Sequence, residues 1–159
     1  MNTRKLTQAS IIAGLYIALT MICQALGLAS QPIQIRISEA LCVLPAFYAS
    51  SIPGLFVGCL LSNVLCGGTV VDIIFGSLTT LIAALITYAL SKYPYLASIP
   101  PIILNALVIP AVLMSYTDIT GTYFYFFVCI FLGELISCGI FGTILVHSIK
   151  TKKILKHLK

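Results

Sequence analysis

The sequence predicts an all-α membrane protein, a compact bundle of six transmembrane helices with both termini in the cytoplasm. Three observations predict it. The chain is 60% hydrophobic and 8% charged, with a mean hydropathy of +1.10, whereas soluble domains carry about 25% charged residues. Its apolar residues form long runs, and its basic residues gather at the two ends. We expect a single integral-membrane domain over residues 1–159, multi-pass in the cell membrane.

The apolar runs set the predicted helices, because a span needs about 20 residues at 1.5 Å rise each. The runs are residues 6–28, 38–50, 53–66, 72–91, 98–116 and 121–148. The second and third are short for an upright crossing and contain Pro45, Pro53 and Gly54. They are therefore either compact, tilted helices or a broken hairpin packed inside protein.

The basic residues predict the orientation. If the chain crosses the membrane six times, the following basic residues all lie on one face: Arg4, Lys5, Lys92, Lys150, Lys152, Lys153, Lys156 and Lys159. Only Arg36 lies on the other face. The positive-inside rule then places both termini in the cytoplasm, whereas five helices would separate the two basic clusters. The net charge of +5 thus reflects topology, and we expect no nucleic-acid partner.

The acidic residues fall in the outer half of this predicted bundle. Glu39, Asp72 and Asp118 come at the external ends of spans, whereas Glu134 lies inside the last helix. Glu134 follows Tyr123 by about 11 residues, roughly 16 Å, near the middle of a hydrocarbon core of about 30 Å. Such residues usually face a protein interior or a wet cavity. Glu134 is therefore a predicted ligand-binding residue, with a hydrogen-bonded structural glutamate as the alternative.

Other polar and aromatic residues share these helices. Tyr123 and Phe127 precede Glu134 on the same predicted side and form an expected aromatic wall for a flat ligand. Asn63 and Asn105 are amides within the third and fifth helices, where an amide either bridges helices or contacts a ligand. Both readings stay open for each asparagine.

The fourth helix opens on Asp72 and continues with a stripe of small residues that includes Gly76 and Thr80. Small residues on one stripe let membrane helices approach closely, so this face is expected to be interior. Asp72 itself either caps the helix or lines the external mouth of a site.

The segment Ser30 to Ile37 joins the first two helices on the outside. It alternates isoleucine with Gln34 and Arg36, which predicts a short extended lid with its apolar residues facing down. Arg36 and Glu39 are then either a gate over a ligand or an interfacial ion pair of little energetic value.

Several motifs of other functions are absent from the sequence. There is no GxxxxGK[ST] loop, HExxH or GxSxG motif, and no nucleophile set, so we expect no enzyme and no ATP site in this chain. The six cysteines show no ligand spacing, and we expect no metal. Ala9 and Ala13 form an AxxxA pattern, which supports close helix contact but is weak alone.

Five stretches in the same order carry a resemblance: "RISEALCVLP", "IPGLFVGCLLSN", "GGTVVDIIFGSLTTLIAALITY", "NALVIP" and "LGELISCGIFG". Over about residues 8–146 the chain resembles the queuosine-precursor transporter family, substrate-binding (S) components of energy-coupling factor transporters. The resemblance implies a six-helix S component that works with a transmembrane coupling subunit and two cytoplasmic ATPase subunits, which use the ATP. In this superfamily the loop after the first helix covers the ligand, and AxxxA docks the coupling subunit, a role that would fall to Ala9 and Ala13.

The substrate that the resemblance implies is a 7-deazaguanine such as preQ1, preQ0 or queuine. On this interpretation Glu134 or Glu39 accepts hydrogen bonds from the guanine-like donor edge, and Asn63, Asn105 or Arg36 donates to the ligand. Asp72 would line the mouth and Tyr123 or Phe127 would stack on the ring. Which acid takes which edge stays open, as does whether the coupling module is dedicated or shared.

Two other transporter readings remain. A proton-coupled secondary transporter would work through Glu134 without ATPases, although the chain lacks the internal repeat common in such folds. An S component for another vitamin-like micronutrient would keep the same fold and partners. An intramembrane enzyme would need a catalytic set that the sequence does not show.

Overall fold

All six apolar runs form helices in the computed structural model, which describes residues 2–28, 33–115 and 123–157, with side chains to residue 152. The elements are α1 (Thr3–Ala25), η1 (Ile37–Ala46), α2 (Ser51–Leu65), η2 (Asp72–Gly76), α3 (Ser77–Ala89), η3 (Pro94–Leu96), α4 (Ile99–Met114), α5 (Tyr123–Glu134), η4 (Leu135–Ile140) and α6 (Phe141–His157). The described residues contain no strand. The all-helical prediction is confirmed.

Four helical stretches are long and apolar enough to cross a membrane. They are Thr3–Ala25, Asp72–Ala89, Pro94–Met114 and Tyr123–Lys152. The apolar elements η1 and α2 are shorter, as the sequence predicts. η1 is a 3₁₀ helix, whose larger rise lets ten residues reach about 20 Å instead of the roughly 15 Å of an α-helix.

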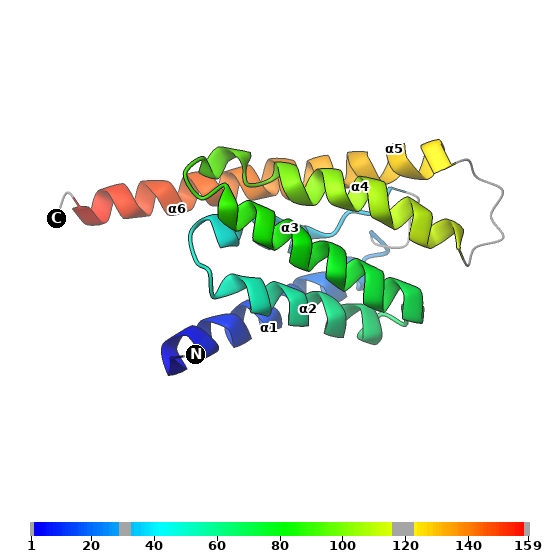
Figure 1. Ribbon diagram of the computed structural model, residues 1–159, viewed down its shortest axis with the longest axis horizontal. Coiled ribbons are helices and arrows are strands. Elements are labelled where there is room, and N and C mark those ends of the chain that lie inside the picture. Colours follow the sequence, from blue (N-terminus) through cyan, green and yellow to red (C-terminus); the bar gives the residue numbers. More distant parts are fainter. Residues whose placement is uncertain (1, 29–32, 116–122, 158–159) are drawn as a thin grey trace.

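The helical stretches lie side by side along the long axis of the molecule (Figure 1). α1 packs on α2, α2 on α3, α3 on α4 and α4 on α5, while η1 packs against α1, α3 and α6. α1 begins and α6 ends at the same end of the bundle, on the left of Figure 1. Lys150 of α6 lies 4.3 Å from the ring centre of Tyr95 in η3, so the turn between α3 and α4 is also at this end.

Two helices carry a short π-helical stretch. η2 lies near the start of the helix that continues as α3, directly after Val70 and Val71, and η4 joins α5 to α6 without a break. A π-helical turn widens the helix and often marks a functional site, because it redirects side chains. Asp72 begins η2 and Glu134 immediately precedes η4, so both predicted site acids stand at such a turn.

The AxxxA pattern of α1 meets a GxxxG pattern of α2. A Cβ added at Gly54 would lie 2.5 Å from the carbonyl oxygen of Ala9, and one at Gly58 would lie 3.2 Å from Cα of Ala13. Ala9 and Ala13 are 6% and 8% exposed. Both alanines are buried packing residues in this structure, in contact with α2. The physical reason is that α2 offers glycines at the same spacing, so the two backbones close on each other.

This contact predicts that two glycine substitutions differ strongly in their effect on stability. Gly54→Ala forces a methyl group against the backbone of Ala9 and should lower the free energy of unfolding by about 1 to 3 kcal/mol, the usual cost of overpacking. Gly14→Ala on α1 meets nothing within 4 Å and should leave stability unchanged or slightly raised. Melting temperatures of the two purified variants in detergent would check this, and equal temperatures would contradict the contact.

Candidate functional site

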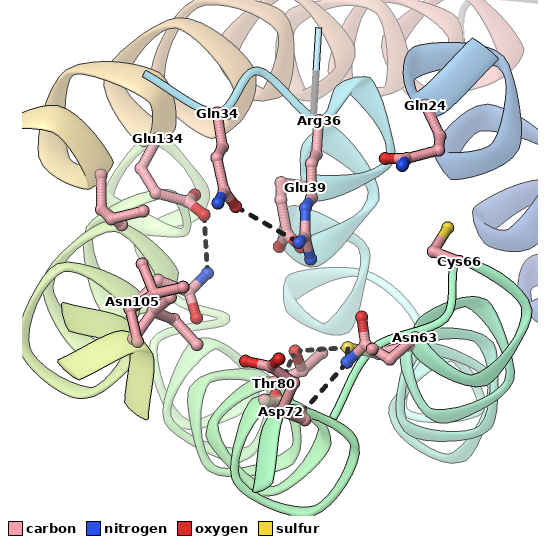
Figure 2. Close-up of a pocket in the computed structure, with 16 residues that line it drawn as sticks. Gln24, Gln34, Arg36, Glu39, Asn63, Cys66, Asp72, Thr80, Asn105 and Glu134 are labelled. Carbon is pink, nitrogen blue, oxygen red and sulfur yellow. Dashed lines mark hydrogen bonds between the residues drawn. The ribbon is translucent and has the colours of Figure 1, made fainter. Parts of the chain in front are cut away.

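A cavity of about 150 Å³ lies between the helices. Its lining includes Gln24 near the end of α1 and Cys66 just after α2, so the cavity lies in the half of the bundle away from the termini. This volume is below the roughly 300 to 1,000 Å³ of sites for drug-sized ligands and fits a small molecule. Figure 2 labels the side chains that define its chemistry, namely Gln24, Gln34, Arg36, Glu39, Asn63, Cys66, Asp72, Thr80, Asn105 and Glu134. Apolar lining comes from α4 and α5, through Ile109, Leu113 and Ile130.

Six of the eight predicted substrate-binding residues line this cavity. They are Arg36, Glu39, Asn63, Asp72, Asn105 and Glu134. They come from the segment before η1, η1 itself, α2, η2, α4 and the last residue of α5. Up to 98 residues separate them along the chain (134 − 36), so only the antiparallel packing of the helices brings them together.

Glu39 is held by the protein on both carboxylate oxygens. The hydroxyl of Tyr16 donates to Oε1, and the thiol of Cys42 donates to Oε2 at 3.1 Å. Glu39 is 4% exposed. Beside it, the hydroxyl of Thr20 donates to Oγ of Ser38 at 2.7 Å. Glu39 therefore ties η1 to α1 and has little acceptor capacity left for a ligand.

Only one carboxylate oxygen of Glu134 has a hydrogen-bond partner among the described residues. Nδ2 of Asn105 donates to its Oε1 at 2.8 Å, which explains one role of this asparagine. Its Oε2 is buried and has no hydrogen-bond partner among the described residues. The same holds for Nε of Arg36. Buried polar atoms are normally paired, because leaving one unpaired costs about 1 to 3 kcal/mol. Glu134 and Arg36, which both line the cavity, thus each have one buried polar atom without a partner in the described part of the chain.

Asp72 lines the cavity and also takes part in a helix cap, although the N-cap residue is Thr69 and not Asp72 as one prediction had it. Its backbone N–H donates to Oγ1 of Thr69 at 3.2 Å, while its Oδ2 accepts from the backbone N–H of Thr69 at 3.3 Å. This reciprocal pair is a capping box. Nδ2 of Asn63 donates to the carbonyl oxygen of Asp72 at 3.3 Å, so Asn63 bridges α2 and η2 at the cavity wall.

The segment 33–36 lies across the cavity, and its register differs from the prediction. Gln34 and Arg36 line the cavity, whereas Ile33 is 40% exposed, so the expectation that the isoleucines face down is wrong. Nη2 of Arg36 donates to Oε1 of Gln34 at 3.3 Å (Figure 2). The reason is electrostatic, since the acids in the cavity attract the guanidinium, which a lipid-facing register would leave without compensation. Residues 30–32 of the predicted lid lie outside the described residues.

The lid segment is fixed to α5 and η4 by its backbone. The N–H of Arg36 donates to Oγ of Ser137 at 3.0 Å. A Cβ added at Gly133 would lie 2.1 Å from the carbonyl oxygen of Gln34, so only glycine permits this approach. The segment is also held to α1 through the N–H of Ile37, which donates to the sulfur of Cys23 at 3.3 Å.

Tyr123 and Phe127, both described, lie outside the cavity lining. The hydroxyl of Tyr123 donates to the carbonyl oxygen of Leu107 at 2.7 Å and ties α5 to α4. The ring of Phe127 stacks on Phe124 and Phe131, with centres 6.3 Å and 6.0 Å apart. In this structure Phe127 therefore packs against neighbouring rings of α5, and neither it nor Tyr123 belongs to the cavity lining.

Sequence reasoning misses three polar lining residues. Gln24 is a lone amide inside the first apolar run, a signal that could have found it, and Thr80 belongs to the small-residue stripe interpreted as helix packing. Gln34 falls on the outer side of the lid in the predicted register. Asp118, the fourth acid, lies outside the described residues.

Comparison with known proteins shows the family to which the chain belongs. The chain is 38% identical over 81 residues to the queuosine precursor transporter QueT of Lactococcus lactis subsp. cremoris (strain MG1363). The aligned part covers 51% of this chain and 47% of that relative, so the chain spans about half the length of the curated relative it matches. No solved structure matches the chain. The family model described as QueT transporter matches residues 6–151, nearly the whole sequence. The chain, a multi-pass membrane protein by its apolar helices, therefore belongs to the QueT transporter family.

Proposed function

We propose that this protein captures a queuosine precursor, a 7-deazaguanine, as the S component of an ATP-coupled energy-coupling factor importer. The observation that carries the proposal is the unpaired Oε2 of Glu134 in a small buried cavity. The QueT relative, named as a queuosine precursor transporter, supports the same substrate class.

The chemistry of a 7-deazaguanine matches the two unpaired atoms. Its N1–H and exocyclic amine are adjacent donors, which suit a carboxylate, and its O6 is an acceptor. Glu134 would take the donor edge and Nε of Arg36 would donate to O6. Of the two acids that the sequence left open for this edge, Glu134 is favoured, because Glu39 already accepts hydrogen bonds on both oxygens.

The orientation of the bundle supports capture from outside. α1 begins and α6 ends at the same end of the molecule, and the basic residues of α1 and α6 lie there. By the positive-inside rule this end is cytoplasmic, in the cell membrane. The cavity, in the other half, would then open toward the exterior and the segment 33–36 would cover it as a lid.

Energy would come from partner subunits, because the sequence contains no P-loop. A transmembrane coupling subunit and two cytoplasmic ATPase subunits are the partners in this proposal. Since Ala9 and Ala13 are buried against α2, the coupling subunit would contact other residues of α1, such as those around the exposed Gly14.

Uptake of radiolabelled preQ1 into cells that express this protein with coupling and ATPase subunits would test the proposal. We expect uptake to stop when the P-loop lysines of both ATPases are replaced, while the purified protein alone still binds preQ1. Uptake that persists without active ATPases but stops with a protonophore would instead support a proton-coupled secondary transporter. Stabilisation of the purified protein only by another vitamin-like compound would identify a different S component.

A further inference from the structure

The charges of this chain are distributed very unevenly. Three of its four acidic residues, Glu39, Asp72 and Glu134, line the one cavity described above. Among the lysine and arginine side chains that the structure describes, only that of Arg36 does so. A chain with a net charge of +5 thus surrounds its cavity with three carboxylates and one guanidinium, a formal excess of two negative charges. Carboxylates inside a membrane bundle are costly, so this excess requires a function.

The hydrogen bonds to these acids do not neutralise the excess negative charge of the cavity. Glu39 accepts from Tyr16 and Cys42, and Oδ2 of Asp72 accepts from Thr69, but all three donors are neutral. Arg36 supplies one positive charge. Glu134 is only 8% exposed, and its Oε2 has no hydrogen-bond partner in the described part of the chain. The three carboxylates that line the cavity thus outnumber the cations described beside them, and a positively charged group on the ligand would reduce this imbalance.

A metal ion does not fit the arrangement. Within the described residues no group of three or more His, Cys, Asp or Glu side chains is close enough to hold one. Glu134 and Asp72 instead reach the cavity from different walls, α5 and the start of η2 (Figure 2). Two acids on separate walls suit an organic cation that has a second polar end.

A 7-deazaguanine carries its substituent on the five-membered ring, on the far side of the bicycle from the donor edge. One carboxylate therefore cannot contact both ends. Building on the proposed function, we infer that Asp72 forms a cation subsite for the substituent, so that the protein selects the precursor whose substituent is a protonated amine. With Glu134 on the donor edge, Asp72 is the remaining cavity acid with acceptor capacity, because Glu39 is held on both oxygens.

The matched ligands preQ1 and preQ0 test this inference, because they share one bicycle and differ in an aminomethyl group against a neutral nitrile. Dissociation constants of the purified protein in nanodiscs would be measured for both. We expect the wild-type protein to prefer preQ1 by about tenfold or more, the effect of one charge-assisted hydrogen bond. In Asp72→Asn the preference should fall to about twofold or less, mainly through weaker preQ1 binding.

The variant keeps the N-cap residue Thr69, and an asparagine oxygen at position 72 still accepts from the N–H of Thr69, so its melting temperature without ligand checks the fold. Thr69→Val is the control that disturbs the capping box but keeps the charge, and it should retain the preference. Equal affinities of the wild-type protein, or an unchanged preference in Asp72→Asn, would overturn the inference and leave the proposed function standing. Failure of both ligands to bind would overturn the proposed function together with the inference.

Discussion

Glu134→Gln should weaken the binding of a 7-deazaguanine by about a hundredfold or more while the protein stays folded. The carboxylate is expected to accept two charge-assisted hydrogen bonds, each contributing about 1.5 to 3 kcal/mol. A glutamine retains the shape but loses the charge and one acceptor, and its amide N–H₂ would face the donors of the ligand. Isothermal titration of the wild-type and variant proteins with preQ1 would measure the loss.

Glu39→Gln provides the matched comparison, because it makes the same chemical change at the other buried glutamate of the cavity. Glu39 accepts from Tyr16 and Cys42, so its replacement should lower the melting temperature of the ligand-free protein. Glu134→Gln should leave that temperature unchanged or raise it, since it removes a buried charge with one oxygen unpaired. A folded Glu134→Gln protein with wild-type affinity would exclude Glu134 from the site.

Gly133→Ala should lower ligand affinity by about tenfold or more by displacing the lid segment. The new methyl group would lie 2.1 Å from the carbonyl oxygen of Gln34. The position of a Cβ is fixed by its own backbone, and the carbonyl oxygen of Gln34 is itself backbone, so neither atom can rotate away. The segment must therefore move, at a cost of about 1 to 3 kcal/mol. That segment carries Gln34 and Arg36 into the cavity, and the hydrogen bond from Arg36 to Ser137 would be strained with it. Stopped-flow dissociation of preQ1 should show faster release.

Gly139→Ala is the control for this substitution, six residues further along the same continuous helix. Its Cβ would lie 3.7 Å from the side chain of Ile102, an ordinary van der Waals distance. We expect wild-type affinity and release rate. If Gly133→Ala and Gly139→Ala behave alike, the close approach of the lid to α5 does not govern ligand retention.

The helices and the identity of most site residues are predictable from sequence, because both depend on local signals. Apolar runs of sufficient length predict every described helix except the short η3, and proline and glycine predict that η1 and α2 are short. Rare polar residues in an apolar chain are conspicuous, so the amino-acid sequence alone is enough to select Arg36, Asn63, Asp72, Asn105 and Glu134. Burial of such groups is costly, which is why they concentrate at one cavity.

The tertiary structure decided which of these groups are free and which surfaces are covered. The sequence leaves open whether Glu39 or Glu134 accepts from a ligand, and the positions of Tyr16, Cys42 and Asn105 distinguish the two acids. The same applies to the alanines of α1, since a small-residue pattern shows that a helix approaches closely but not which helix approaches. Hydrogen-bond partners and packing neighbours here lie 23 to 101 residues apart in several cases, and hydrophobic periodicity contains no information about such pairs. Composition and local pattern thus determined that the chain buries acids in a helical bundle, whereas long-range packing determined which acid oxygen has no hydrogen-bond partner among the described residues.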